Sequence, residues 1–168
     1  SEISYVAQDN FLFNTSIKEN IKMGNPNASD DEIIEAAKAA SCHNFIMELE
    51  NGYDTKVGDA GGALSGGERQ RITIARAMLK QAKVIILDEA TAFADPENEY
   101  LIQSAINNLI KGKTLIVVAH RLSTITNADT ILVMKDGEIV ENGTHDNLVK
   151  KDGVYASLWK NYVGGLDD

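Results

Sequence analysis

The 168-residue sequence has little of what several protein classes require. Cys42 is the single cysteine, which argues against a disulfide framework and fits a cytosolic setting. We interpret it as a small, half-buried helix side chain and not as a catalytic thiol. Apolar runs such as residues 115–119 fall far short of the ~18 residues that a membrane span needs, and residues 1–8 lack the pattern of a signal peptide.

Basic residues are also few. The chain carries 16 Lys and Arg against 25 Asp and Glu, for a net charge of −9. Non-specific nucleic-acid binding depends on clustered Lys and Arg, so no such surface is expected. The hydrophobic fraction of 43% and the charged fraction of 24% are ordinary for soluble globular proteins. The length fits one domain, and no internal repeat or low-complexity tract is evident.

The apolar pattern predicts an α/β protein. Short apolar runs predict strands at residues 3–7, 84–87 and 114–119, and the run 84–87 is typical of a strand buried on both faces of a parallel sheet. Helix signals and turn residues predict further elements. These are helices over 16–23, 30–40, 43–49, 65–79 and 96–110, a loop over 53–63, a helical turn near 122–125, a hairpin turning at 135–137, and a helical region capped by Thr144 and reaching Tyr162.

A glycine-rich stretch, Leu64-Ser65-Gly66-Gly67-Glu68, leads into one of these helices. Its serine and the glutamate three residues later form a capping-box pattern, which places the helix N-cap at the serine. Ser29 and Glu32 form the same pattern at the start of the helix predicted over 30–40. Unpaired N–H groups and the positive end of the helix dipole at such a terminus bind phosphate. The sequence therefore predicts a phosphate site at this turn.

Polar residues follow each of the three predicted strands: Gln8, the pair Asp88-Glu89, and His120. Ligands of open parallel sheets bind beyond the carboxyl ends of the strands, so these side chains are expected to converge. Asp88 suits Mg²⁺, Glu89 could act as general base for an attacking water, Gln8 could ligate the metal or the water, and His120 could reach the terminal phosphate. Each residue alone also fits an ordinary loop or capping role, so the hypothesis depends on the joint pattern.

The tripeptide Gly112-Lys113-Thr114 looks like the tail of a phosphate-binding P-loop. The position that needs the first glycine is Asn107, however. The tripeptide also leaves a predicted helix and enters a strand, whereas a P-loop runs from strand to helix. We interpret it as a tight helix-to-strand turn with Gly112 just past the helix end.

Together these residues resemble the nucleotide-binding domain of ATP-binding cassette (ABC) transporters. Leu64–Glu68, followed by Arg-Gln-Arg, resembles the family's signature motif, and residues 84–89 resemble its Walker B strand and catalytic glutamate. In the same way Gln8 resembles the Q-loop, Ala94-Asp95 the D-loop and His120 the switch histidine. The similarity covers nearly the whole chain. Two runs look most like exporters of the multidrug, lipid or siderophore type, at 8–21 and 58–68, whereas residues 91–95 depart from the usual serine and leucine near the D-loop.

The resemblance implies a P-loop NTPase-like, mostly parallel α/β core with an inserted, all-helical signature subdomain. Residues 9–80 would form the mainly helical subdomain, and residues 1–8 and 81–168 the core and the C-terminal helices. The family's Walker A loop and adenine-stacking aromatic precede the Q-loop, and this chain begins shortly before Gln8. The core is therefore expected to be truncated.

The resemblance also implies ATP and Mg²⁺ as cofactors. In the family, the signature of one subunit contacts the ATP held by the other. Leu64, Ser65, Gly66, Gly67, Glu68 and Asp95 would accordingly contact ATP in trans, Gln8 and Asp88 would hold the metal, and Glu89 and His120 would be catalytic. A helix N-terminus contributes only ~0.3–1 kcal/mol to holding an anion, up to ~2, whereas micromolar binding needs about 8 kcal/mol. The isolated chain is therefore expected to bind ATP weakly and not to hydrolyse it.

The implied partners are a second nucleotide-binding domain in a head-to-tail dimer and the coupling helices of a transmembrane domain, at the cytoplasmic face of the cell membrane. The run that begins at Gln8 would contact the coupling helix. Neither nucleic acid nor direct membrane insertion of this segment is expected. Two alternatives stay open: a soluble ABC protein acting in DNA maintenance or on ribosomes, and a truncated, non-catalytic interaction module. Proteins of the first kind usually carry coiled-coil insertions or basic segments, which this chain lacks.

Overall fold

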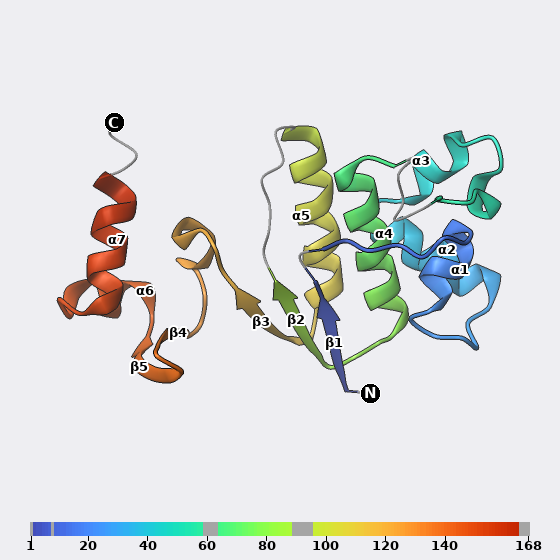
Figure 1. The fold of residues 1–168 in the computed structure, drawn as a ribbon. Helices are drawn as coiled ribbons and strands as arrows, with labels where there is room; N and C mark the ends of the chain where they lie inside the picture. The colour runs from blue at the N-terminus through green and yellow to red at the C-terminus, as the bar shows by residue number, and fades with distance from the viewer. Residues whose placement is uncertain (1, 8, 59–63, 89–95, 165–168) are drawn as a thin grey trace. The chain divides into compact units, whose positions relative to one another are not determined.

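The computed structural model describes residues 2–7, 9–58, 64–88 and 96–164. It divides into two compact units, Ser1–Val118 and Ala119–Asp168, shown in Figure 1. The first unit holds a parallel sheet with a group of helices, and the second holds a hairpin with two helices.

The sheet of the first unit has three parallel strands, β1 (Ile3–Val6), β2 (Val84–Asp88) and β3 (Thr114–Val118), in the order β1-β2-β3. Ile85 pairs with Ser4 on one side and with Leu115 on the other. The predicted strands and their parallel arrangement are thus confirmed. Because all three run in the same direction, their carboxyl ends lie at one edge of the sheet.

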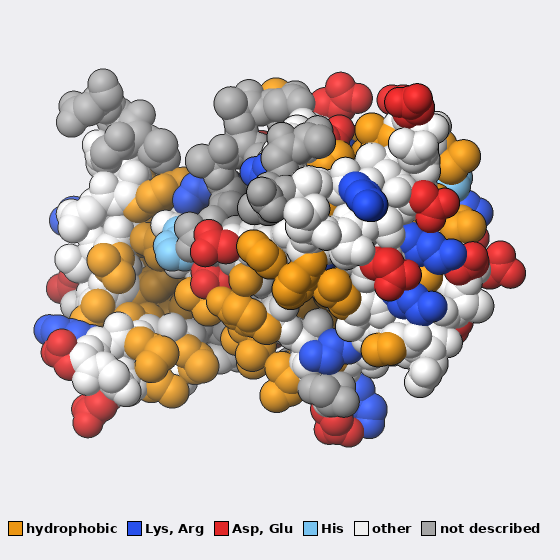
Figure 2. Space-filling model, turned by 45° about the vertical axis from the view of Figure 1, so that its right-hand side comes forward, with side chains coloured by type: hydrophobic (Ala, Val, Ile, Leu, Met, Phe, Trp, Pro, Cys, Tyr) orange, Lys and Arg blue, Asp and Glu red, His pale blue; other side chains and the backbone are white. Residues whose placement is uncertain are grey.

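Two long helices, α4 (Gly66–Leu79) and α5 (Pro96–Ile110), pack on one face of this sheet (Figure 1). Val6, Ile85 and Leu87 belong to the core cluster that these helices help to form. The opposite face carries hydrophobic side chains that are between 48% and 58% exposed, namely Ile3, Tyr5, Ile116 and Val118, and Figure 2 shows the hydrophobic surface that gathers there.

The expectation that β2 is buried on both faces is therefore wrong. Ile85 and Leu87 are buried, but Val84, Ile86 and Asp88 are only half-buried. Side chains of a strand alternate between the two faces of its sheet. The described helices cover one face only, so every second residue of β2 keeps contact with solvent.

The shorter helices of the first unit are α1 (Ile17–Lys22), α2 (Asp30–Ala39) and α3 (His43–Glu48), followed by the 3₁₀ turn η1 (Gly52–Asp54). The expected capping box of α2 is present between Ser29 and Glu32. The loop expected from residue 53 begins after η1, since Tyr53 lies within that turn. Gly112 has a φ of +68°, which confirms the helix-to-strand turn between α5 and β3.

In the second unit, η3 (Leu122–Ile125) precedes the antiparallel hairpin of β4 (Ile131–Lys135) and β5 (Glu138–Gly143). The single helical region expected after Thr144 is instead two helices, α6 (His145–Lys150) and α7 (Val154–Gly164). Asp152 between them has a φ of 52°, which an α-helix does not accommodate. Thr144 occupies the N-cap of α6, but its side chain makes no capping hydrogen bond.

Candidate functional site

The N-terminal turn of α4 has the geometry that the sequence predicts. The Ser65 side-chain oxygen accepts a hydrogen bond from the Glu68 backbone N–H at 3.2 Å, and the Glu68 carboxylate accepts one from the Ser65 backbone N–H at 2.8 Å. The capping box and the N-cap at Ser65 are thereby confirmed. The first N–H groups of a helix have no partner within it, and Gly66 and Gly67 occupy two of these positions.

Two capping boxes of the first unit differ in one hydrogen bond. In α2 the Ser29 hydroxyl also donates to its glutamate, at 3.0 Å. Within the described part of the chain, no such bond is found for the Ser65 hydroxyl, and Ser65 is exposed. The Ser65 O–H, together with the amides of the first turn, can therefore donate to an anion outside the molecule.

One hydrogen bond within the N-terminal region of α4 and one close approach to α5 fix this turn. Leu64 is buried, and its carbonyl accepts a hydrogen bond from the Arg69 guanidinium at 3.0 Å. Gly67 is buried where α4 meets α5, and a Cβ at that position would lie 2.8 Å from Oδ1 of Asn98. Glycine at position 67 thus permits a close approach of the two helices that a larger residue would obstruct.

Asp88 ends β2 at the carboxyl edge of the sheet. The Tyr5 hydroxyl, from the neighbouring strand, donates to Oδ2 of Asp88 at 3.1 Å. This hydrogen bond to a carboxylate is the main cause that raises the pKa of Tyr5. The carboxylate of Asp88 is an oxygen ligand of the kind that Mg²⁺ prefers, and Mg²⁺ is often held by one or two carboxylates together with substrate phosphates. Asp88 therefore fits a magnesium ligand by its chemistry and its place at the sheet edge.

The remaining predicted site residues are not tested by this geometry. Gln8, Glu89 and Asp95 lie outside the described residues. His120 is exposed, follows the end of β3 by two residues and belongs to the second unit. Their convergence with Asp88 stays a prediction. Among the described residues, no group of three or more His, Cys, Asp and Glu side chains is placed to hold a metal ion.

Cys42 is more buried than the sequence indicates. It is completely inaccessible, and burial raises the pKa of its thiol to about 12. Because the thiolate is the nucleophile, a thiol of this kind is inert near neutral pH. The interpretation of Cys42 as a structural residue is consistent with this position, although the residue lies at the N-cap of α3 and not inside a helix.

Three residues of this region give no clear functional signal in the sequence: Tyr5, Arg71 and Asn98. Arg71 is buried among the apolar residues of α4. A charged residue on the apolar face of a predicted helix is the one feature of the sequence that could have drawn attention to it. Tyr5 and Asn98 reach their partners only in the folded chain, over 83 and 27 residues of sequence.

Among the described residues, no helix combines the length and the apolar character required to cross a bilayer.

Fold and site together define an α/β protein that presents a serine-capped helix N-terminus and places an acidic residue at the carboxyl edge of a parallel sheet. The family model described as ABC transporter matches residues 1–92, which is more than half of the 168 residues. The chain therefore belongs to the ABC transporter family, and the resemblance seen in its motifs is confirmed.

Similar proteins agree with this assignment. The chain is 52% identical over 159 residues, 95% of its length, to proteins named multidrug export ATP-binding/permease protein from Staphylococcus aureus strains NCTC 8325 and RF122. It also matches the structure of a bacterial Atm1-family ABC exporter with ATP bound, with a TM-score of 0.85, 44% identity and 95% of this chain covered. The chain spans 28% of the length of each of these proteins.

Proposed function

We propose that this chain is part of the ATP-hydrolysing subunit of an ABC exporter, in which it helps to power the export of a drug, lipid, siderophore or other small molecule. The observation that carries the proposal is the N-terminus of α4, where the exposed Ser65 caps the helix within the five residues Leu64–Glu68 that resemble the family signature. The named relatives, which are export ATP-binding/permease proteins, support the same activity.

In this proposal the signature turn acts on a nucleotide held by a second nucleotide-binding domain in a head-to-tail dimer. The Ser65 hydroxyl and the amides of Gly66 and Gly67 would donate to phosphate oxygens of that ATP, with Leu64, Glu68 and Asp95 completing the contact. Helix N-termini favour anions because their free N–H groups and the helix dipole point at the ligand. The Glu68 carboxylate accepts from the Ser65 backbone N–H, and within the described residues it accepts no bond from the Ser65 hydroxyl, so this hydroxyl is available to a ligand.

The carboxyl edge of the sheet would serve this chain's own nucleotide. Asp88 and Gln8 would hold Mg²⁺, which neutralises phosphate charge when bound. Glu89 would take a proton from the attacking water as general base, and His120 would donate to the terminal phosphate. The segment that begins at Gln8 would contact the coupling helices of a transmembrane domain at the cytoplasmic face of the membrane. Nucleic acid is not among the proposed partners.

The test uses the full-length protein in lipid and measures ATP turnover. Ser65→Arg should abolish turnover, because the side chain would occupy the place of the phosphate. Ser29→Arg is the matched control, since it removes the serine of a capping box of the same kind at α2 and should leave turnover near the wild-type rate. Equal turnover of the two variants would contradict the assignment of Ser65.

Two further measurements address the other roles. Glu89→Gln in the full-length protein should retain ATP binding but lose turnover, because the base is removed while Asp88 is kept. The isolated 168-residue chain should bind MgATP only weakly and not hydrolyse it. A calorimetric titration that gave micromolar affinity for the isolated chain would contradict this last expectation.

A further inference from the structure

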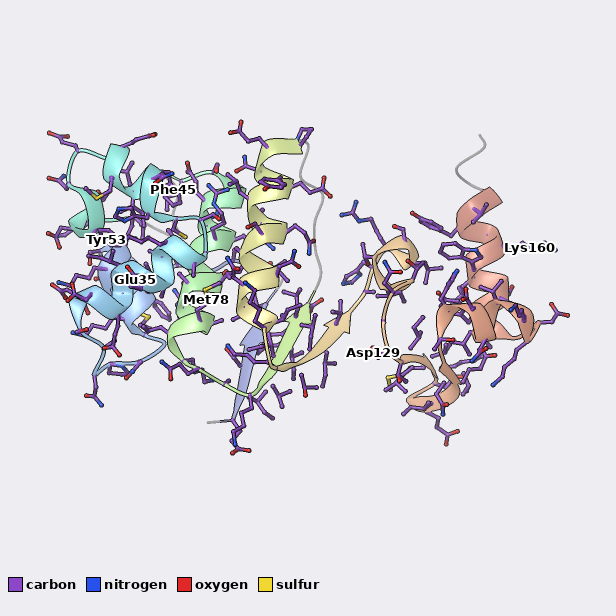
Figure 3. All side chains as sticks on the ribbon, turned by 180° about the vertical axis from the view of Figure 1, so that it is seen from behind. Glu35, Phe45, Tyr53, Met78, Asp129 and Lys160 are labelled. Atoms are coloured by element: carbon purple, nitrogen blue, oxygen red, sulfur yellow. The ribbon has the colours of Figure 1, made fainter. Side chains whose placement is uncertain are left out.

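Arg71 is a charged residue in an unusual place. It lies on α4, six residues after the serine that caps the helix, and only 4% of its surface is exposed. Its guanidinium donates to Oδ1 of Asn98 at 2.8 Å, and its Cζ lies 5.3 Å from the centre of the Phe45 ring. Phe45, labelled in Figure 3, comes from α3. The guanidinium is thus enclosed by α3, α4 and α5.

The hydrogen bond to Asn98 has no substitute in the described part of the chain. Within those residues, Nε of Arg71 is buried and has no acceptor, and Asn98 is the acceptor that the guanidinium reaches. A buried charge is costly unless it is paired or hydrogen-bonded. Loss of the bond to Asn98 would therefore leave the buried guanidinium without its hydrogen-bond acceptor, which favours the arrangement in which α5 stays where Asn98 can accept.

Asn98 also lies close to the beginning of α4. It is the third residue of α5, and its Oδ1 lies 2.8 Å from the position that a Cβ on Gly67 would occupy. Gly67 belongs to the signature turn. One side chain on α5 thus contacts the first turn of α4 directly and binds its second turn through Arg71.

We propose that Arg71 and Asn98 are positioning residues for the signature turn, because their buried hydrogen bond ties the first turns of α4 to the first turn of α5. The proposal rests on the function proposed above, in which Ser65 and the neighbouring amides meet a phosphate of the partner subunit. Donors that stabilise a reacting phosphate must be held in place before it arrives, and a displacement of about 1 Å can cost roughly a hundredfold in rate. A helix N-terminus tied to α5 by a buried hydrogen bond meets that requirement.

The experiment compares three asparagine variants in the full-length protein. Asn98→Leu removes the acceptor at similar size, and Asn98→Asp keeps an oxygen acceptor for Arg71. Asn108→Leu is the matched control, because Asn108 lies near the other end of α5 and its side chain also joins two helices, donating to the Ala39 carbonyl at 2.9 Å. The readouts are kcat and KM for ATP, and hydrogen exchange of the backbone amides of residues 66–71.

Asn98→Leu should lower kcat by about tenfold to a hundredfold, change KM less than kcat, and speed amide exchange over residues 66–71. Asn98→Asp and Asn108→Leu should both keep kcat and this exchange near the wild-type values. If Asn98→Leu does not fold, Asn98→Ala removes the acceptor without added bulk beside Gly67 and carries the same expectation.

Wild-type kcat in the variant that lacks the acceptor, or an equal loss in Asn108→Leu, would overturn the proposal. A wild-type protein that does not hydrolyse ATP would instead overturn the proposed function. In that case hydrogen exchange still tests whether the Arg71–Asn98 bond holds the turn. Unchanged amide exchange over residues 66–71 in Asn98→Leu would show that it does not.

Discussion

Asn20→Ala is expected to destabilise the chain strongly, because one buried side chain joins α1, α4 and the segment before α1. Asn20 is completely buried, and its side chain makes four hydrogen bonds. Its Oδ1 accepts from the Phe13 backbone N–H at 2.9 Å and from the Arg76 guanidinium at 3.0 Å. Its Nδ2 donates to the carbonyls of Phe13 and Ser16, both at 3.0 Å.

The magnitude follows from these bonds. A neutral hydrogen bond contributes about 1 kcal/mol net, and one to a charged group about 1.5–3 kcal/mol. Alanine would also leave a half-buried guanidinium with one acceptor fewer, although Arg76 keeps its bond to the Asn20 backbone carbonyl at 2.8 Å. Since neighbouring bonds do not add fully, the expected loss in the free energy of unfolding is about 3–5 kcal/mol.

Urea unfolding of the 168-residue chain, followed by far-ultraviolet circular dichroism, measures this loss. With a slope of about 2 kcal/mol per molar urea, the midpoint should fall by about 1.5–2.5 M. Asn27→Ala is the matched control. Asn27 is exposed and its side chain makes no hydrogen bond within the described residues, so its midpoint should stay within about 0.3 M of the wild type. A loss below about 1 kcal/mol for Asn20→Ala would refute the reasoning.

Three further results are expected. Gly67→Ala should lower the free energy of unfolding by about 1–3 kcal/mol. The loss should be smaller in the Asn98→Ala background, because the side-chain oxygen that the new Cβ meets is then absent. Urea unfolding of Gly67→Ala against wild type, and of the double variant against Asn98→Ala, measures both losses. Cys42 should resist a thiol reagent at pH 8 in the folded chain and react in urea, since burial holds its pKa at about 12; rapid labelling of folded protein would contradict it. Hydrogen bonds from Ser29 lower the pKa of Glu32 below its ordinary value of 4.5. The stabilisation from Glu32 is therefore present at neutral pH and lost as the pH falls through the folded-state pKa, so Glu32→Gln should flatten the fall in stability on acidification, measured by thermal unfolding between about pH 5 and pH 3.

Features that depend on a few neighbouring residues could mostly be predicted from the sequence. The capping boxes of α2 and α4 were both expected at the serines where they occur, because a capping box involves residues only three positions apart. The helix-to-strand turn at Gly112 was expected for a similar reason, since a glycine past a helix end adopts the left-handed conformation. The division of the last helical region between α6 and α7 was missed, because Asp152 in a left-handed conformation gives no strong signal.

The candidate site was predicted in part. The parallel order of the strands places Asp88 at the carboxyl edge as expected, while the Tyr5 hydroxyl that binds Asp88 was not anticipated. The two residues are 83 positions apart, and their contact depends on the register of two strands. Register is a property of the assembled sheet, so a single strand sequence does not reveal which side chains will meet across it.

The amino-acid sequence alone was enough to specify the membership in the ABC transporter family, the elements of the α/β core and the N-cap of α4, because capping residues, apolar runs and glycine-rich motifs act within a few residues of one another. The tertiary structure decided which face of the sheet is covered and which buried polar groups meet, as Arg71 and Asn98 do. These depend on helices and strands distant in the chain being brought together by packing. Whether a charged side chain or a sheet face is buried therefore depends on the helices and strands that pack against it in the folded chain.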